Sequence, residues 1–262
     1  MTRVIAVANQ KGGVGKTTTC VNRAASLAAT RRRVLLVDMD PQGNATMGCG
    51  VNKYELERST GDLLTGDARG SDIRCRVKQG DFDLLPGNDV LTAAEVELVR
   101  MPGREFQLRN ALAELKNEYE FVLIDCPPAL NMLTVNGLAA ADGVLIPMQC
   151  EYYALEGLSA LVATINQIKA AVNPKLEIEG ILRTMFDPRN NLANDVSGQL
   201  LTHFGKKVYG TVIPRNVRLA EAPSFGLPAL FHDKNSRGAL AYLALAGEIN
   251  RRQAESVEPA VA

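Results

Sequence analysis

The chain has 262 residues, 46% of them hydrophobic and 22% charged, and its 29 basic and 29 acidic side chains give a formal net charge of zero. This size suits one large domain, and the balanced charge favours no class of partner. The five cysteines are widely spaced without a C-x-x-C pair, which argues for reduced, cytosolic thiols rather than a disulfide framework or a zinc site.

Short β-branched segments alternate with segments of helical periodicity along the chain. Apolar runs predict strands over 4–9, 32–40, 82–87, 120–128, 143–149, 177–186 and 208–214. Apolar residues at helical spacing predict helices near 108–115 and 158–168. A helix is expected to follow the glycine-rich segment from Lys16 to about Ala29, and further helices are expected near 193–204 and 236–252.

The strands are apolar on both faces, and the helices between them supply the long connections that parallel pairing needs. We therefore predict a three-layer α/β fold, with a mainly parallel twisted sheet flanked by helices and ligands at the carboxyl ends of its strands. A single domain is expected over 1–252 and a flexible tail over 253–262. No apolar run approaches the roughly 18 residues of a membrane span, and the N-terminal run is too short for a signal peptide. We expect a soluble, cytoplasmic protein.

A glycine-rich segment, NQKGGVGKTTT (9–19), follows the first predicted strand. Glycines allow consecutive backbone N–H groups and a helix N-terminus to face a phosphate. Lys16 is expected on the β- and γ-phosphates and the Thr17 hydroxyl on Mg²⁺. The first glycine of the usual phosphate-loop pattern is replaced by Gln10, and Lys11 is an additional lysine.

KGGVGKTT (11–18) resembles the deviant Walker A motif of the ParA/MinD superfamily. DMDPQGNAT (38–46), VLIDCPPAL (122–130) and IPRNVRLAEAPSFG (213–226) resemble the ParA/Soj partition ATPases, in the same order and spacing. The resemblance covers nearly the whole chain except 52–80 and the tail. It implies a P-loop NTPase fold, ATP and Mg²⁺ as ligands, and nucleotide binding by Lys11, Gly12, Gly13, Val14, Gly15, Lys16, Thr17 and Thr18.

The resemblance gives Lys11 a particular role. By itself this residue could be a solvated loop charge. In the ParA/MinD superfamily the corresponding lysine reaches across an ATP-bound homodimer to the partner's nucleotide, where a cation supplied in trans promotes phosphoryl transfer. Lys11 and Lys16 are therefore expected to be catalytic, and dimerisation is expected to depend on ATP.

Polar residues at the ends of other strands complete the expected site. The resemblance implies that Asp40 orients the attacking water, with slow intrinsic hydrolysis, and Asp38 is expected to assist it. Asp125 fits a Walker B acid, and both Asp40 and Asp125 are expected to hold Mg²⁺ through water. Pro214 and Asn216 resemble residues that line the adenine.

Basic side chains are concentrated near the C-terminus, where residues 183–252 hold ten Lys or Arg and five Asp or Glu. Arginines on one face bind DNA phosphates without reading sequence. The resemblance implies DNA binding by Arg189 and Arg218, and Arg183 and Arg215 are expected to contribute. No motif for base-specific recognition is present, so the expected partner is non-specific double-stranded DNA.

The resulting hypothesis is a nucleoid-associated DNA-segregation ATPase whose hydrolysis is stimulated by a ParB-type centromere-binding protein. Three alternatives remain open at this point. A MinD-like membrane-cycling ATPase is disfavoured because the tail forms no long basic amphipathic helix. An iron-protein-like reductase would use Cys126 and Cys150, although their spacing matches no cluster motif. A nucleotide-binding regulator that does not hydrolyse ATP would not depend on Asp40.

Overall fold

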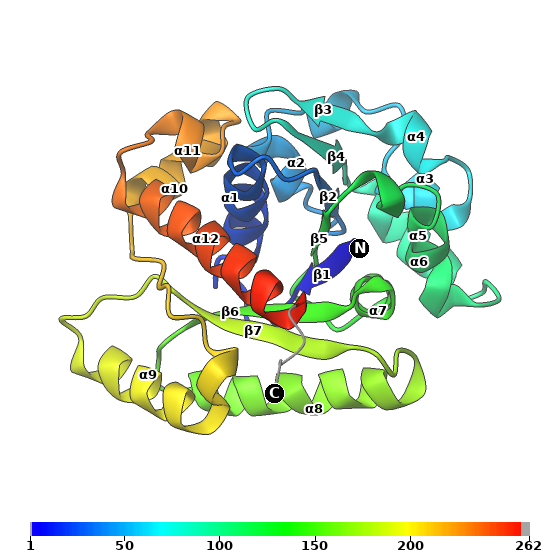
Figure 1. Ribbon diagram of the computed structural model, residues 1–262. Coiled ribbons are helices and arrows are strands. Elements are labelled where there is room, and N and C mark those ends of the chain that lie inside the picture. Colours follow the sequence, from blue (N-terminus) through cyan, green and yellow to red (C-terminus); the bar gives the residue numbers. More distant parts are fainter. Residues whose placement is uncertain (1, 258–262) are drawn as a thin grey trace.

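A single seven-stranded sheet organises the protein, whose computed structural model describes residues 2–257 (Figure 1). The strand order is β3-β4-β2-β5-β1-β6-β7, and all neighbouring pairs are parallel except β3 with β4. The predicted fold class is confirmed. The strands are β1 (Arg3–Val7), β2 (Val34–Asp38), β3 (Cys75–Val77), β4 (Phe82–Leu85), β5 (Phe121–Asp125), β6 (Gly143–Gln149) and β7 (Glu177–Thr184).

Helices cover both faces of the sheet (Figure 1). On one face lie α1 (Lys16–Ala29), α2 (Asn44–Gly48), α10 (Val217–Glu221), α11 (Ala229–His232) and α12 (Arg237–Val257). On the other lie α3 (Thr60–Thr65), α4 (Gly70–Ile73), α5 (Val90–Leu98), α6 (Gln107–Leu112), α7 (Met132–Ala140), α8 (Ala154–Ala171) and α9 (Asn191–Phe204). The 3-10 helices are η1 (Lys53–Glu55), η2 (Arg104–Phe106), η3 (Lys116–Glu118), η4 (Gly205–Lys207) and η5 (Ala222–Phe225).

The hydrophobic core is divided by the sheet into two clusters. Along β1, Val4 and Ala6 belong to one cluster, whereas Ile5 and Val7 belong to the other. Successive side chains of a strand point to opposite faces, so a strand that is apolar throughout is covered on both sides. This is the three-layer arrangement that the sequence predicts.

The segment 208–214 is not a strand, contrary to the prediction. It makes only isolated bridges to the edge of the sheet, at Ile181–Val208 and Phe186–Pro214. Between these bridges the backbone N–H groups of Gly210 and Thr211 donate to the carboxylate of Glu248 on α12, each at 2.9 Å. The side chain from α12 therefore replaces β7 as their hydrogen-bond acceptor and interrupts the ladder.

Other elements lie in segments for which no helix or strand was predicted. Residues 52–80 form η1, α3, α4 and the antiparallel strand β3. Helix α7 follows the predicted Walker B segment, and Asn131 caps it by accepting a hydrogen bond from the Thr134 N–H at 3.1 Å. Helix α12 continues to Val257, five residues beyond the predicted end. The rest of the predicted tail, 258–262, lies outside the described residues.

Candidate active site

The carboxyl ends of three central strands meet at one edge of the sheet. In the parallel register, Val7 at the end of β1 is opposite Asp125 at the end of β5, and Asp125 is opposite Asp38 at the end of β2. The glycine loop after β1 therefore begins beside the two aspartates. Strand pairing alone brings together segments more than 80 residues apart in the chain.

The glycine loop turns sharply into α1. Gly13 and Gly15 adopt φ of 73° and 86°, in the left-handed region that favours glycine. The backbone carbonyl of Val14 accepts a hydrogen bond from the Thr184 hydroxyl at 2.8 Å, which ties the loop to β7. The Val14 side chain is buried and does not line the cavity described below, so only its backbone is available to a ligand.

Lys16 is 7% exposed, and its Nζ donates to the carbonyl of Lys11 at 3.2 Å. Burial lowers the pKa of the Lys16 ammonium, and the charges of Asp125 and Asp40 oppose this shift. A buried cation with a single weak acceptor is suited to binding an anion. These features support Lys16 as the phosphate lysine, and its role stays a prediction.

A cavity of about 560 Å³ opens over the loop and the strand ends. It brings together the glycine loop, Asp40 and the segment after β5, as the sequence predicts, and it also contains residues that the sequence analysis did not identify. Its lining residues are Gly12, Gly13, Gly15, Lys16, Thr17, Thr18, Asp40, Pro41, Gln42, Asn44, Pro127, Pro128, Ala129, Asn131 and Met185. At Gly12, no protein atom lies within 4 Å of the position that a Cβ would occupy. The space beside this glycine is therefore open to a ligand.

Asp125 is fully buried, and its Oδ2 has no hydrogen-bond partner in the described part of the chain. Burial first, and then the charge of Asp38, raise the pKa of Asp125 to about 8. An orphaned carboxylate oxygen in this position fits a nearby cation or a water bound to one. No cluster of three or more His, Cys, Asp or Glu among residues 2–257 could bind a metal directly. The side chains present therefore fit a Mg²⁺ ion held by Thr17, water and phosphate oxygens rather than by a carboxylate cage.

Asp38 does not have the assisting role that we expected. Its Oδ2 accepts hydrogen bonds from the N–H and the hydroxyl of Thr46 at 2.8 and 2.7 Å, and its Oδ1 accepts from the Asp40 N–H at 3.2 Å. Burial raises the pKa of Asp38 to about 6, although these hydrogen bonds oppose the shift. Asp38 is absent from the cavity lining and instead supports the turn that carries Asp40.

Asp40 lines the cavity and is 9% exposed. Its Oδ1 accepts a hydrogen bond from the Gln42 N–H at 3.0 Å, while its backbone carbonyl accepts from the Gly43 N–H at 2.8 Å. Within the described residues, Oδ2 accepts no hydrogen bond. One carboxylate oxygen fixes the turn, and the other is available to a water molecule in the cavity.

Lys11 lies outside the cavity lining. Its Nζ is 2.5 Å from Oε2 of Glu151 in the same chain, and both side chains are about half exposed. Its backbone N–H donates to the side chain of Asn9 at 3.0 Å. Lys11 therefore faces the surface beside the site, where a second molecule has access to it.

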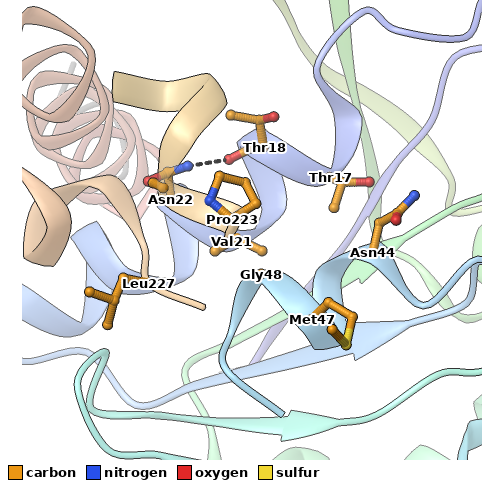
Figure 2. Close-up of a pocket in the computed structure, with 10 residues that line it drawn as sticks. Thr17, Thr18, Val21, Asn22, Asn44, Met47, Gly48, Pro223 and Leu227 are labelled. Atoms are coloured by element: carbon orange, nitrogen blue, oxygen red, sulfur yellow. Dashed lines mark hydrogen bonds between the residues drawn. The ribbon is translucent and has the colours of Figure 1, made fainter. Parts of the chain in front are cut away.

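Pro214 and Asn216, predicted to line the adenine, are not in the lining of this cavity. The Asn216 side chain accepts from the Arg218 N–H at 3.0 Å and caps α10. A second cavity of about 250 Å³ lies between α1, α2 and η5, and it shares Thr17, Thr18 and Asn44 with the first (Figure 2). Its walls include Met47 and Leu227, which lie outside the quoted motifs, and Pro223, which belongs to the 213–226 motif.

The four predicted DNA-binding arginines fall into two groups. The side chain of Arg189 is 89% exposed and pairs with Asp187, and Arg215 and Arg218 are also at the surface. Arg183 is 8% exposed, and its guanidinium donates to the Ser197 hydroxyl at 2.7 Å and to the carbonyl of Tyr209 at 2.9 Å. The prediction that Arg183 contributes to a DNA-binding surface is wrong, because its charge is used inside the fold.

The cysteines do not support the reductase alternative. Cys126 and Cys150 are buried, and burial raises the pKa of both thiols, that of Cys150 to about 11. A cluster shared between two subunits requires exposed thiolates. Among residues 2–257, no helix is both long and apolar enough to cross a membrane.

A strand, a glycine loop and a helix that begins at a phosphate lysine define this chain as a P-loop nucleoside triphosphatase. A family model described as an AAA domain matches residues 2–178. The chain is 51% identical to the Myxococcus xanthus chromosome partitioning protein ParA over 95% of this chain and 88% of that protein. It is 52% identical to the Thermus thermophilus chromosome-partitioning ATPase Soj over 97% of this chain and 98% of that protein. The chain belongs to the ParA/Soj family of chromosome-partitioning ATPases, as its motifs indicate.

The fold is also similar to that of a solved structure, the cobyrinic acid a,c-diamide synthase of Mycobacterium smegmatis with bound ADP and magnesium. The two chains are 39% identical, the TM-score is 0.86, and the match covers 98% of this chain and 97% of the other.

Proposed function

We propose that this protein is an ATP-driven DNA-segregation switch. ATP with Mg²⁺ closes a homodimer, the dimer binds nucleoid DNA without sequence preference, and a ParB-type centromere-binding protein stimulates hydrolysis and release. The observation that carries this proposal is the separation of the two lysines. Lys16 is buried in the phosphate cavity, whereas Lys11 is half exposed beside it.

The chemistry of hydrolysis follows from the cavity. Lys16 and the loop N–H groups bind the phosphates, and the free oxygen of Asp40 orients a water molecule for attack on the γ-phosphate. Thr17 would hold Mg²⁺ directly and Asp40 and Asp125 would hold it through water, and the ion would supply positive charge to the phosphate oxygens. Because Asp40 positions the water rather than acting as a strong base, intrinsic hydrolysis is slow.

A second subunit completes the site. Lys11 pairs with Glu151 outside the cavity lining, and its half-exposed side chain is accessible to a facing copy of the chain. An ammonium group leaves water at low cost only when an anion receives it. The triphosphate of the partner subunit is such an anion, so that ATP occupancy controls dimerisation.

Three arginines form the proposed DNA-binding surface. The Phe186–Pro214 bridge places the loop that carries Arg189 next to the segment that carries Arg215 and Arg218. Arg189 and Arg215 both lower the pKa of Asp187, which is about 2, so the two charges lie on the same surface. Arg218 pairs with Glu221 and Asp233. These surface ion pairs are weak, so DNA phosphates can replace the carboxylates as partners of the arginines.

The test is co-sedimentation with DNA in ATP, in ADP and without nucleotide, at two salt concentrations. Binding should require ATP, weaken with salt and fail in an Arg189→Glu/Arg218→Glu variant. The matched control is Arg58→Glu/Arg100→Glu, which makes the same charge change at exposed arginines near α3 and α5. DNA binding that is independent of ATP, or equally weakened by both variants, would contradict the proposal.

A further inference from the structure

We propose that Lys53 is a positioning residue for hydrolysis, which stabilises the turn that carries Asp40 in the conformation that hydrolysis requires. Lys53 lies in the 52–80 segment, which the family resemblance does not cover. The inference rests on the proposed role of Asp40 in orienting water, and it deepens that role.

The first step is the contact between Lys53 and the Asp40 turn. Lys53 is the first residue of η1, and its Nζ donates to the carbonyl of Gln42 at 2.5 Å. The same turn is closed internally by the Gln42 N–H on the Asp40 side chain and by the Gly43 N–H on the Asp40 carbonyl. The ammonium group of Lys53 therefore fixes the Gln42–Gly43 peptide unit, whose N–H donates to the backbone carbonyl of Asp40.

The second step is packing. Gly43 has a φ of 57°, and a Cβ at this position would lie 2.8 Å from Cδ of Lys53 and 2.6 Å from the carbonyl oxygen of Gly87. The alkyl chain of Lys53 thus lies directly on the turn, while its charged end binds the turn's carbonyl. The conformation of Gly43 and the position of the Lys53 side chain therefore both depend on the absence of a side chain at residue 43.

The third step is the position of Lys53 itself. The Asn52 side chain accepts from the Tyr54 N–H at 3.2 Å and caps η1, and the Lys53 ammonium lies 5.2 Å from the centre of the Tyr54 ring. Lys53 lines neither of the two cavities at the nucleotide site. It is therefore placed to act through the turn, and not by contact with ATP.

The opposite side of the turn is held by buried hydrogen bonds of the Thr46 and Asp38 side chains. The Thr46 hydroxyl accepts from the Gly87 N–H at 2.8 Å and donates to Asp38, which in turn accepts from the Asp40 N–H. These buried contacts anchor the base of the turn, whereas Lys53 holds its partly exposed outer side. A single exposed hydrogen bond adds little to fold stability, but a displacement of about 1 Å at a reacting group costs up to about 100-fold in rate.

The experiment measures the steady-state ATPase of the full chain with Mg²⁺. Lys53→Ala should lower kcat about tenfold, while KM for ATP and the thermal midpoint stay at the wild-type values. Lys53→Arg should recover most of kcat, because a guanidinium can still donate to the Gln42 carbonyl. The matched control is Lys78→Ala, an exposed lysine of the same segment, which should leave every parameter unchanged.

An unchanged kcat in Lys53→Ala would overturn the inference, as would a raised KM with unchanged kcat, which would mean direct contact with nucleotide. A loss of activity that tracks a lower thermal midpoint would make Lys53 a structural residue and also overturn it. Asp40→Ala separates the two claims. If Asp40→Ala still hydrolyses ATP, the role of Asp40 fails and the inference about Lys53 fails with it. If Asp40→Ala is inactive while Lys53→Ala is fully active, the role of Asp40 stands and only the inference about Lys53 fails.

Discussion

Lys11 and Glu151 form an ion pair within one chain, with Nζ 2.5 Å from Oε2. The pair joins the glycine loop to the segment between β6 and α8, and both side chains are about half exposed. Exposed pairs of this kind contribute roughly 0–1 kcal/mol, so a triphosphate can displace Glu151. In the proposed switch, Glu151 competes with the partner's nucleotide for Lys11.

Glu151→Gln should therefore favour dimerisation. Without the carboxylate, Lys11 is already free to bind across the interface, and the ATP-dependent dimer should form at a several-fold lower protein concentration. Analytical ultracentrifugation over a concentration series measures this shift. Glu156→Gln, at an exposed glutamate in the first turn of α8, should leave it unchanged. An equal or weaker dimer in Glu151→Gln would show that the pair does not compete.

Gly12→Ala should separate binding from folding. Gly12 does not adopt a positive φ, and no protein atom lies within 4 Å of the added Cβ, so the thermal midpoint should not change. The methyl group would occupy space in the phosphate cavity and weaken ATP binding by tenfold or more. Gly15→Ala, at φ 86°, should instead lower both stability and binding. If titration calorimetry gives Gly12→Ala the ATP affinity of the wild type, the proposed phosphate site beside Gly12 is contradicted.

Arg183 and Arg189 should respond differently to truncation. Arg183→Ala would leave the Ser197 hydroxyl and the Tyr209 carbonyl without their buried donor, and we expect it to lower the free energy of unfolding by about 2–3 kcal/mol. Arg189→Ala should keep the wild-type urea midpoint, because this side chain is exposed, but it should weaken DNA binding. A wild-type midpoint for Arg183→Ala would contradict its assignment to the interior.

The stability of the nucleotide-free protein should fall as pH rises. The pKa of Asp125 is about 8 in the fold and about 3.9 in the unfolded chain, so between these values the folded state binds more protons. The contribution of Asp125 to the free energy of unfolding is therefore greatest below about pH 4 and is lost as the pH rises to about 8. The pKa of Asp38 is about 6, so this group also lowers the stability as pH rises, but its effect is complete at a lower pH than that of Asp125.

Asp125→Asn tests this dependence. In EDTA, the variant should show a smaller decrease of thermal midpoint between pH 6 and 8 than the wild type, and a higher midpoint at pH 8. It should also lose Mg²⁺-dependent ATP hydrolysis. An unaltered slope between pH 6 and 8 would mean that Asp125 is already ionised in the apo-protein.

The sequence predicted the parts of the site that depend on local order along the chain. The glycine loop and Asp40 each follow an apolar strand and Asp125 ends one, and parallel strands bring such ends to one edge. The helix Lys16–Ala29 was predicted at its observed limits for the same reason, since its start is fixed by the loop.

What the sequence could not predict depends on contacts between distant segments. The interior position of Arg183 requires Ser197 from α9, and the loss of the 208–214 strand requires Glu248 from α12. Asp38 was assigned to the site because nothing in the sequence indicates that Thr46 would bind its carboxylate. In each case the deciding partner carries no motif and lies on an element whose position follows only from the complete fold.

The most direct test of the account is sedimentation of Lys11→Ala with ATP and Mg²⁺, with nucleotide binding measured in parallel. The account predicts that the variant binds ATP in its own cavity but stays monomeric, while the wild type dimerises. An ATP-bound Lys11→Ala protein that forms dimers as readily as the wild type would contradict it, because the lysine would then have no role across the interface.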